Sequence, residues 1–159
     1  MNWEAIGAIG EVVGAVAVVA TLLYLSTQLR QNTRAAHNSS WQAIVQLLSN
    51  LDVTEATDPS LSEFIRRAES SADGLSDDEM WKFYRVAQAR LGVIEYAFLA
   101  SQSGTIDQFY WDGILPYVEV LASKPGYAEF WVQQGRDIYH PDFVHYFDTV
   151  LRACSADSN

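Results

Sequence analysis

The first stretch of the chain is apolar with almost no interruption. From Ala5 to Leu25, Glu11 is the one acidic or basic side chain in a run of Ile, Val, Ala, Leu and Gly. About 20 apolar residues at a helical rise match the roughly 30 Å core of a bilayer. The pattern predicts a transmembrane anchor helix over residues 1–30. The alternative is the buried core helix of a soluble protein, but a chain of 159 residues has little interior to hide one completely.

Small residues recur within this segment at spacings of three and four, which places them on one side of a helix. A G-x-x-x-G pair stands at the centre of this stripe. In lipid, such a stripe lets two helix backbones approach closely and gain dispersion contacts. We therefore predict a helix-packing interface in the span. Its members, named here the small-residue stripe, are Gly7, Gly10, Gly14, Ala17 and Thr21.

Glu11 lies at the edge of the small-residue stripe, four residues after Gly7 and three before Gly14. A carboxylate that faces lipid is costly, so Glu11 is expected to face protein or water. Three roles remain open for it: a polar contact between helices, part of an ion or proton path, or a side chain that reaches up to the interface.

Charge around the span predicts its direction. Arg30 and Arg34 follow the apolar segment, whereas no Lys or Arg precedes it. Positive residues stay preferentially on the cytoplasmic side, so these membrane-exit arginines place the N-terminus outside and residues 31–159 in the cytoplasm. The segment also lacks the basic start and the small-residue cleavage site of a secretory signal peptide.

Helical periodicity continues through the remaining residues. No Pro or Gly interrupts Leu29 to Asn50, so the first helix is expected to continue to about Asn50. Asp58-Pro59 and the capping box Ser76–Glu79 begin further helices. Pro125 and Pro141 begin two terminal helices, divided near Tyr139. Apolar residues expected on the inner faces include Ile44, Ile65, Ala68, Tyr84, Leu91, Ile94, Phe98, Phe109, Ile114, Val118 and Leu121.

No alternating strand with hairpin signals occurs, so the predicted fold is all-α: a transmembrane helix that continues into a cytoplasmic helical bundle over residues 31–159. The formal net charge of −10 disfavours nucleic acid as a partner, because nucleic acid requires a basic face. The single cysteine, Cys154, excludes an intrachain disulfide and suits a reducing compartment.

Catalytic patterns are scarce. Asp137 with His140, and His145 with Asp148, are each three residues apart, but surface or capping roles are favoured over a metal site. Glu95 is expected to pair with Arg85 or Arg90 in a structural ion pair, and the alternative is an acid that lines a pocket. We predict no catalytic residue, no metal and no cofactor, and no enzymatic activity.

Two groups of motifs stand near the ends of the chain: Trp3 to Glu11, Leu22 to Leu25 and Gln28 to Thr33 near the start, and Pro125 to Tyr127, Phe130, Trp131, Arg136, Tyr139, Pro141 and Phe143 near the end. Together they resemble an uncharacterised family of small bacterial single-pass membrane proteins, seen largely in marine proteobacteria. The resemblance implies an inner-membrane protein with a helical cytoplasmic domain, and it carries no function or catalytic residue.

Three functions fit these observations. The favoured one is a structural or accessory subunit whose span packs against copies of itself or another membrane protein within the lipid bilayer. The second is an oligomeric pore in which Glu11 forms a cation-selecting ring. The third is a membrane-tethered sensor or enzyme with a ligand pocket among the aromatic residues. The first is favoured because the span is single and has one polar side chain deep enough to line a path.

Overall fold

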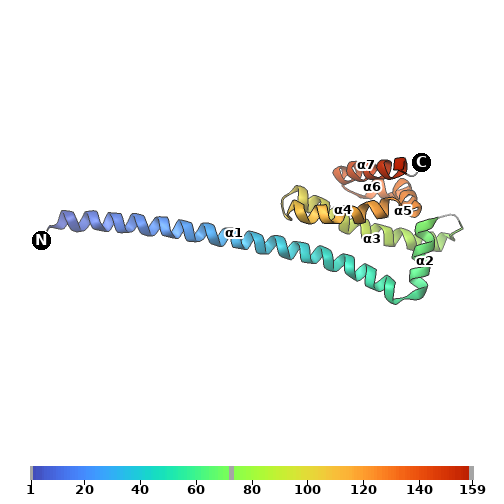
Figure 1. Cartoon of the computed structure of the whole chain (residues 1–159), viewed down its shortest axis with the longest axis horizontal. Helices are drawn as coiled ribbons and strands as arrows, with labels where there is room; N and C mark the ends of the chain where they lie inside the picture. The colour runs from blue at the N-terminus through green and yellow to red at the C-terminus, as the bar shows by residue number, and fades with distance from the viewer. Residues whose placement is uncertain (1, 72–73, 158–159) are drawn as a thin grey trace. The chain divides into compact units, whose positions relative to one another are not determined.

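Helices make up most of the part of the chain that the computed structural model describes, residues 2–71 and 74–157, and no strand occurs there (Figure 1). The all-α prediction is confirmed. Short turns connect the elements, which are α1 Trp3–Thr57, α2 Pro59–Ser70, α3 Asp77–Gln102, α4 Gln108–Ala122, α5 Pro125–Phe130, the π-helix η1 Trp131–Gly135, α6 Arg136–Ile138 and α7 Pro141–Asp157.

The chain divides into two compact units, Met1–Ser39 and Ser40–Asn159. The described residues of the first unit belong almost entirely to α1, and every residue from Gly10 to Thr27 is exposed. Gly10–Thr57 is the one described helical stretch that is long and apolar enough to cross a bilayer, by length and composition. The predicted division at residues 30 and 31 concerns the end of a membrane span and stays a prediction.

The first helix is longer than expected: α1 ends at Thr57, not near Asn50. The residues after Asn50 contain no helix breaker, and the helix stops where Asp58 takes extended backbone angles before Pro59. A residue before proline is disfavoured in the α conformation, so this pair sets the end of α1. The Asp58 carboxylate then accepts hydrogen bonds from the amides of Ser60 and Leu61, at 2.9 and 3.1 Å, and caps α2.

The predicted capping box is confirmed at the start of α3. The Glu79 amide donates to the Ser76 hydroxyl, and the Glu79 carboxylate accepts from the Ser76 amide at 2.9 Å. Pro125 and Pro141 begin α5 and α7 as expected, and Tyr139 lies in the extended backbone between the two terminal helices.

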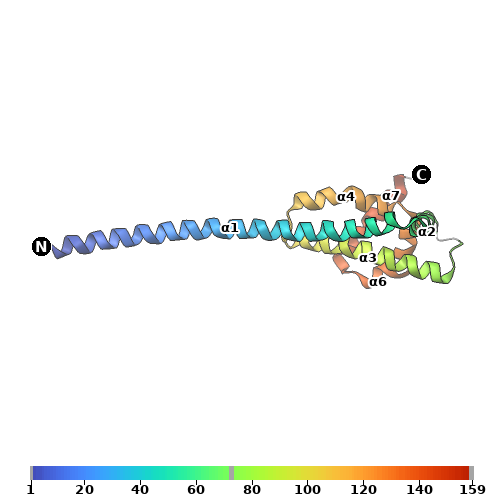
Figure 2. The same cartoon turned by 90° about the horizontal axis from the view of Figure 1, so that it is seen from below.

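In the second unit, α3 forms the centre and packs against α2, α4, α5 and α7. Figure 2 shows the Ser40–Thr57 part of α1 running over α3 and α4. There Ile44 is fully buried and the Trp41 ring stacks on Tyr110 of α4 at a centroid distance of 4.9 Å. The core is built largely from aromatic rings in contact, including Phe83, Phe98, Trp111, Tyr127, Phe130, Trp131, Phe143, Tyr146 and Phe147.

One core residue of α4 was assigned to the wrong face. Phe109, expected inside, is 76% exposed, whereas Trp111 is 4% exposed and packs edge-on against Phe98. The helix begins at Gln108, because Asp107 caps it through the amide of Phe109. Phe109 therefore lies in the first turn of α4, and the buried stripe starts two residues later.

Candidate functional site

Arg90 of α3 is the one buried charged residue among those that the structure describes. It occupies a position on α3 between the core residues Ala87, Leu91 and Ile94, so its stem leaves the helix on the buried face. A buried charge is costly unless it is paired and hydrogen-bonded. The surroundings of Arg90 supply those partners from several helices.

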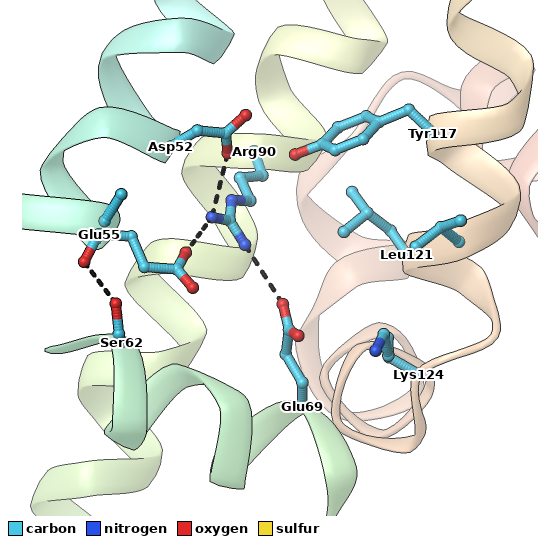
Figure 3. Close-up of a pocket in the computed structure, with 10 residues that line it drawn as sticks. Asp52, Glu55, Ser62, Glu69, Arg90, Tyr117, Leu121 and Lys124 are labelled. Atoms are coloured by element: carbon cyan, nitrogen blue, oxygen red, sulfur yellow. Dashed lines mark hydrogen bonds and ion pairs between the residues drawn. The ribbon is translucent and has the colours of Figure 1, made fainter. Parts of the chain in front are cut away.

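Three carboxylates from two other helices surround the Arg90 guanidinium (Figure 3). Nη2 donates to Asp52 Oδ1 of α1 at 3.3 Å and to the Glu55 carboxylate one helical turn further on. Nη1 donates to Glu69 Oε1 of α2 and to the Tyr127 hydroxyl of α5, both at 3.2 Å. The Arg90 side chain therefore joins α1, α2, α3 and α5. We call Arg90 and these four partners the Arg90 cluster.

The electrostatics of the Arg90 cluster follow from burial opposed by pairing. Burial disfavours the charged guanidinium, but Tyr127 and the Glu55 carboxylate outweigh it, and the pKa of Arg90 lies above its usual value. Burial raises the pKa of Glu69, although Arg90 and Lys124 oppose that shift. Burial likewise raises the pKa of the Tyr127 and Tyr117 hydroxyls, so both are neutral near pH 7.

An open hollow of about 400 Å³ lies beside the Arg90 cluster. In Figure 3, Asp52 and Glu55 lie on one side of it, Tyr117, Leu121 and Lys124 lie on the other, and Glu69 lies between the two sides. The turn between α1 and α2 closes one end, where the Ser62 hydroxyl donates to the Glu55 carbonyl at 2.6 Å. The hollow presents both signs of charge and an apolar wall, which suits recognition of a small polar molecule.

No protein-family model, curated protein or solved structure matches this chain. The resemblance to small bacterial membrane proteins therefore stays a prediction, and the function has to be argued from the residues themselves.

The small-residue stripe lies in the first unit, on an exposed part of α1. A Cβ atom added at Gly7, Gly10 or Gly14 meets no atom within 4 Å, so this side of the helix is open. Ala17 and Thr21 are exposed as well, and the Thr21 hydroxyl donates to the Ala17 carbonyl at 2.8 Å. That bond satisfies the one hydroxyl of the stripe within its own helix.

The other predicted residues of the first unit are also exposed. Glu11 forms no ion pair with any residue that the structure describes. Arg30 and Arg34 lie on the surface of α1 after the apolar stretch. Their roles at a membrane stay predictions.

The ion pair expected for Glu95 is wrong. Glu95 is half-buried, and its carboxylate accepts from the His140 amide at 2.6 Å, so it holds the start of α7. Arg90, one of its two expected partners, points instead to Asp52, Glu55 and Glu69.

The two aspartate–histidine pairs are not brought together as a metal site. Within residues 2–71 and 74–157, no group of three or more His, Cys, Asp or Glu side chains is arranged so that it could hold a metal ion. Asp148 Oδ1 instead accepts from Trp131 Nε1 at 2.7 Å and from Arg136 Nη2 at 3.0 Å. Burial opposes its ionisation, but these two donors outweigh burial and lower the pKa of Asp148.

The Arg90 cluster was missed at the level of the sequence, although part of its signal is present. Arg90 falls on the apolar face of a predicted helix, between Ala87 and Leu91, and a charge in that place requires partners. Asp52 and Glu55 are three residues apart, which suits one helix face. They lie beyond the expected end of α1 at Asn50, so the predicted helix does not include them.

Proposed function

We propose that this protein is a membrane-anchored structural or accessory subunit that assembles through α1 with copies of itself or with another membrane protein. The observation that carries this proposal is the exposure of a long apolar surface. Val12, Val16, Val19, Leu22 and Leu25 are each more than half exposed on α1. Apolar surface in water costs about 25 cal/mol per Å², so a continuous run of this length requires lipid or protein around it.

The exposure of the most apolar window of this helix supports the bilayer as that surrounding. In the core helix of a soluble protein, neighbouring elements bury the apolar residues. None of the most apolar window of Gly10–Thr57 is buried within the described structure. A bacterial inner membrane, with Arg30 and Arg34 on the cytoplasmic side, satisfies both the apolar run and the charges that follow it.

The small-residue stripe supports assembly through this helix. Hydrophobic burial does not drive helices together in lipid, so association depends on close packing and hydrogen bonds. The open space around Gly7, Gly10 and Gly14 leaves room for a second helix backbone. A partner helix at that face gains dispersion contacts that a bulky side chain prevents.

The decisive experiment measures the mass of the complex purified from native membranes in a mild detergent. Gly10→Leu and Gly14→Leu each place a bulky side chain on the stripe and are expected to lower the mass to that of the monomer. Ala15→Leu is the matched control, because Ala15 lies about 100° around the helix from Gly14. Its mass is expected to equal that of the wild type.

Two results would contradict the proposal. A wild-type protein that stays monomeric and monodisperse in buffer without any amphiphile has no membrane anchor. A complex whose mass is the same in all four proteins does not assemble through the small-residue stripe.

A further inference from the structure

The hollow beside the Arg90 cluster has a charge balance that its own side chains leave incomplete. Asp52, Glu55 and Glu69 share one guanidinium, so two of their negative charges are not neutralised by Arg90. Lys124 lines the same hollow, and no carboxylate oxygen of the described residues lies within 4 Å of its Nζ. The Lys124 ammonium therefore forms no ion pair with these carboxylates; Figure 3 shows Asp52 and Glu55 across the hollow from it and Glu69 between.

The hydrogen bonding of Arg90 is also incomplete. Its side chain is 6% exposed, yet Nε is the one buried side-chain nitrogen or oxygen of the described residues without a partner. A buried donor without an acceptor costs about 1–3 kcal/mol, and such groups are rare in folded proteins. This donor is independent of the carboxylates and favours an acceptor near Arg90.

Apolar side chains line the hollow as well. Ala56, Val120 and Leu121 lie next to the charged groups, and Val120 is half exposed. The volume of about 400 Å³ lies within the usual range of small-molecule sites, about 300–1,000 Å³. A ligand that matches the carboxylates, the Lys124 ammonium and the apolar residues has a positive group, a negative group and a short apolar body.

We propose that this hollow binds a small zwitterion with an apolar body, of the class of free aliphatic α-amino acids. The ammonium of the ligand faces Glu69 and Asp52, where negative charge is in excess. Its carboxylate faces Lys124 and the Tyr117 hydroxyl and accepts hydrogen bonds on the Arg90 side. Its side chain packs on Val120 and Leu121. The site lies wholly within the second unit and goes beyond the proposed anchoring function.

Calorimetric titration of the full-length protein in detergent micelles tests this assignment with L-leucine as the probe. Two comparison compounds separate its charges: 3-methylbutylamine lacks the carboxylate, and 4-methylpentanoate lacks the ammonium. Leucine is expected to bind and to raise the thermal midpoint of unfolding. Each comparison compound is expected to bind at least about tenfold more weakly, because it leaves either Lys124 or the carboxylates without a group of opposite charge.

Matched variants locate the site. Lys124→Gln and Glu69→Gln are each expected to weaken leucine binding at least about tenfold. Lys82→Gln and Glu63→Gln change exposed residues outside the hollow and are expected to leave it unchanged. Circular dichroism checks that each variant is folded. If Glu69→Gln does not fold, Lys124→Gln alone tests the site.

The assignment is overturned if leucine gives no heat and no thermal shift at tens of millimolar. It is overturned as well if 3-methylbutylamine binds as tightly as leucine, because the carboxylates alone then account for binding. Equal weakening by Lys124→Gln and Lys82→Gln indicates a general charge effect and contradicts it too. None of these results bears on the mass of the complex, so the anchoring proposal stands or falls separately.

Discussion

Two buried glycines of the second unit, Gly126 and Gly135, have no space for a side chain. A Cβ atom at Gly126 of α5 would lie 2.1 Å from the Ala68 carbonyl oxygen, and one at Gly135 would lie 2.5 Å from Cε3 of Trp131. The first obstacle is backbone and the second is a fully buried ring, so neither gives way at low cost. Gly126 thereby allows α5 to approach α2 closely.

We expect Gly126→Ala to lower the free energy of unfolding by about 1–3 kcal/mol, the usual cost of overpacking. Gly92→Ala is the control, since a Cβ there meets no atom within 4 Å. It lies within α3, where alanine favours the helix by about 0.8–1 kcal/mol over glycine. Urea unfolding followed by circular dichroism measures both. Similar changes in the two variants would contradict the close approach.

Asp148 gives a pH dependence whose sign is fixed by its surroundings. Its pKa is lowered from the ordinary value of 3.8, because the donors Trp131 and Arg136 outweigh burial. The folded state therefore binds this proton less tightly than the unfolded state. The stabilisation is present above the unfolded pKa and is lost as the pH falls through the lower folded pKa.

Asp148→Asn is accordingly expected to flatten the fall in thermal midpoint below about pH 4, where the wild type loses this stabilisation. Asp137→Asn serves as the control, because Asp137 is exposed on the neighbouring α6 and forms no ion pair with the described residues. A wild-type slope that persists in Asp148→Asn would show that other carboxylates dominate the acid response.

At this scale the sequence predicts that a polar residue needs a partner, but not which partner it has. The sequence indicates Glu95 as an acid near the apolar face of α3, with Arg85 or Arg90 only as its expected partner. The partners of Glu95 and Arg90, the His140 amide and the three carboxylates, are between 21 and 45 residues away in the chain. Such pairing depends on how α1, α2 and α7 pack on α3, which local spacing does not contain.

Helix ends are the feature of the elements that the sequence predicts best. Asp58-Pro59 and Ser76 act through bonds that span two or three residues, so their pattern is complete within a short window. The predicted end of α1 near Asn50 was too early. It depended on the absence of Pro and Gly from Leu29 to Asn50, whereas the residue pair that ends the helix is Asp58-Pro59. The π-helix η1 has no such local signal; its wider turn accompanies the buried rings of Trp131 and Phe147.

The Arg90 cluster holds these elements together. Arg90→Met keeps the apolar stem but removes the guanidinium that Asp52, Glu55 and Glu69 share. Removing one partner of a buried ion pair costs about 3–5 kcal/mol, and the half-exposed Asp52 places the expected loss of unfolding free energy at the lower end. Tyr127 loses its donor as well.

Arg85→Met is the matched control for this variant, since Arg85 is exposed on the same helix and contacts the Trp81 ring at 5.8 Å. Its expected cost is about 0.5–1 kcal/mol or less. Chemical unfolding of both variants, with hydrogen exchange at Asp52 to Thr57, distinguishes a tie between helices from a general loss of charge. Equal costs would contradict the tie.

Over the whole molecule, composition predicts two kinds of surface. The apolar run and the acidic remainder were separable from the sequence, because each is a property of a long window and averages over local errors. The arrangement of the second unit was not, since it depends on pairs such as Trp41 with Tyr110, which join residues far apart in the chain. The hollow beside Arg90 exists because four helices converge there, so no single window contains it.

Whether the apolar part of α1 lies in a bilayer can be tested by two substitutions of equal chemistry on this helix. Val16 and Val53 are 63% and 59% exposed, so within the chain they have similar surroundings. An aspartate near the centre of a span costs about 2.5–3.5 kcal/mol on insertion scales, whereas one exposed to water costs little. Val16→Asp is therefore expected to raise the fraction released from membranes by alkaline carbonate, and Val53→Asp to leave it at the wild-type level. If the apolar run were merely exposed to solvent, both substitutions would be neutral, because the carboxylate would be hydrated at either position.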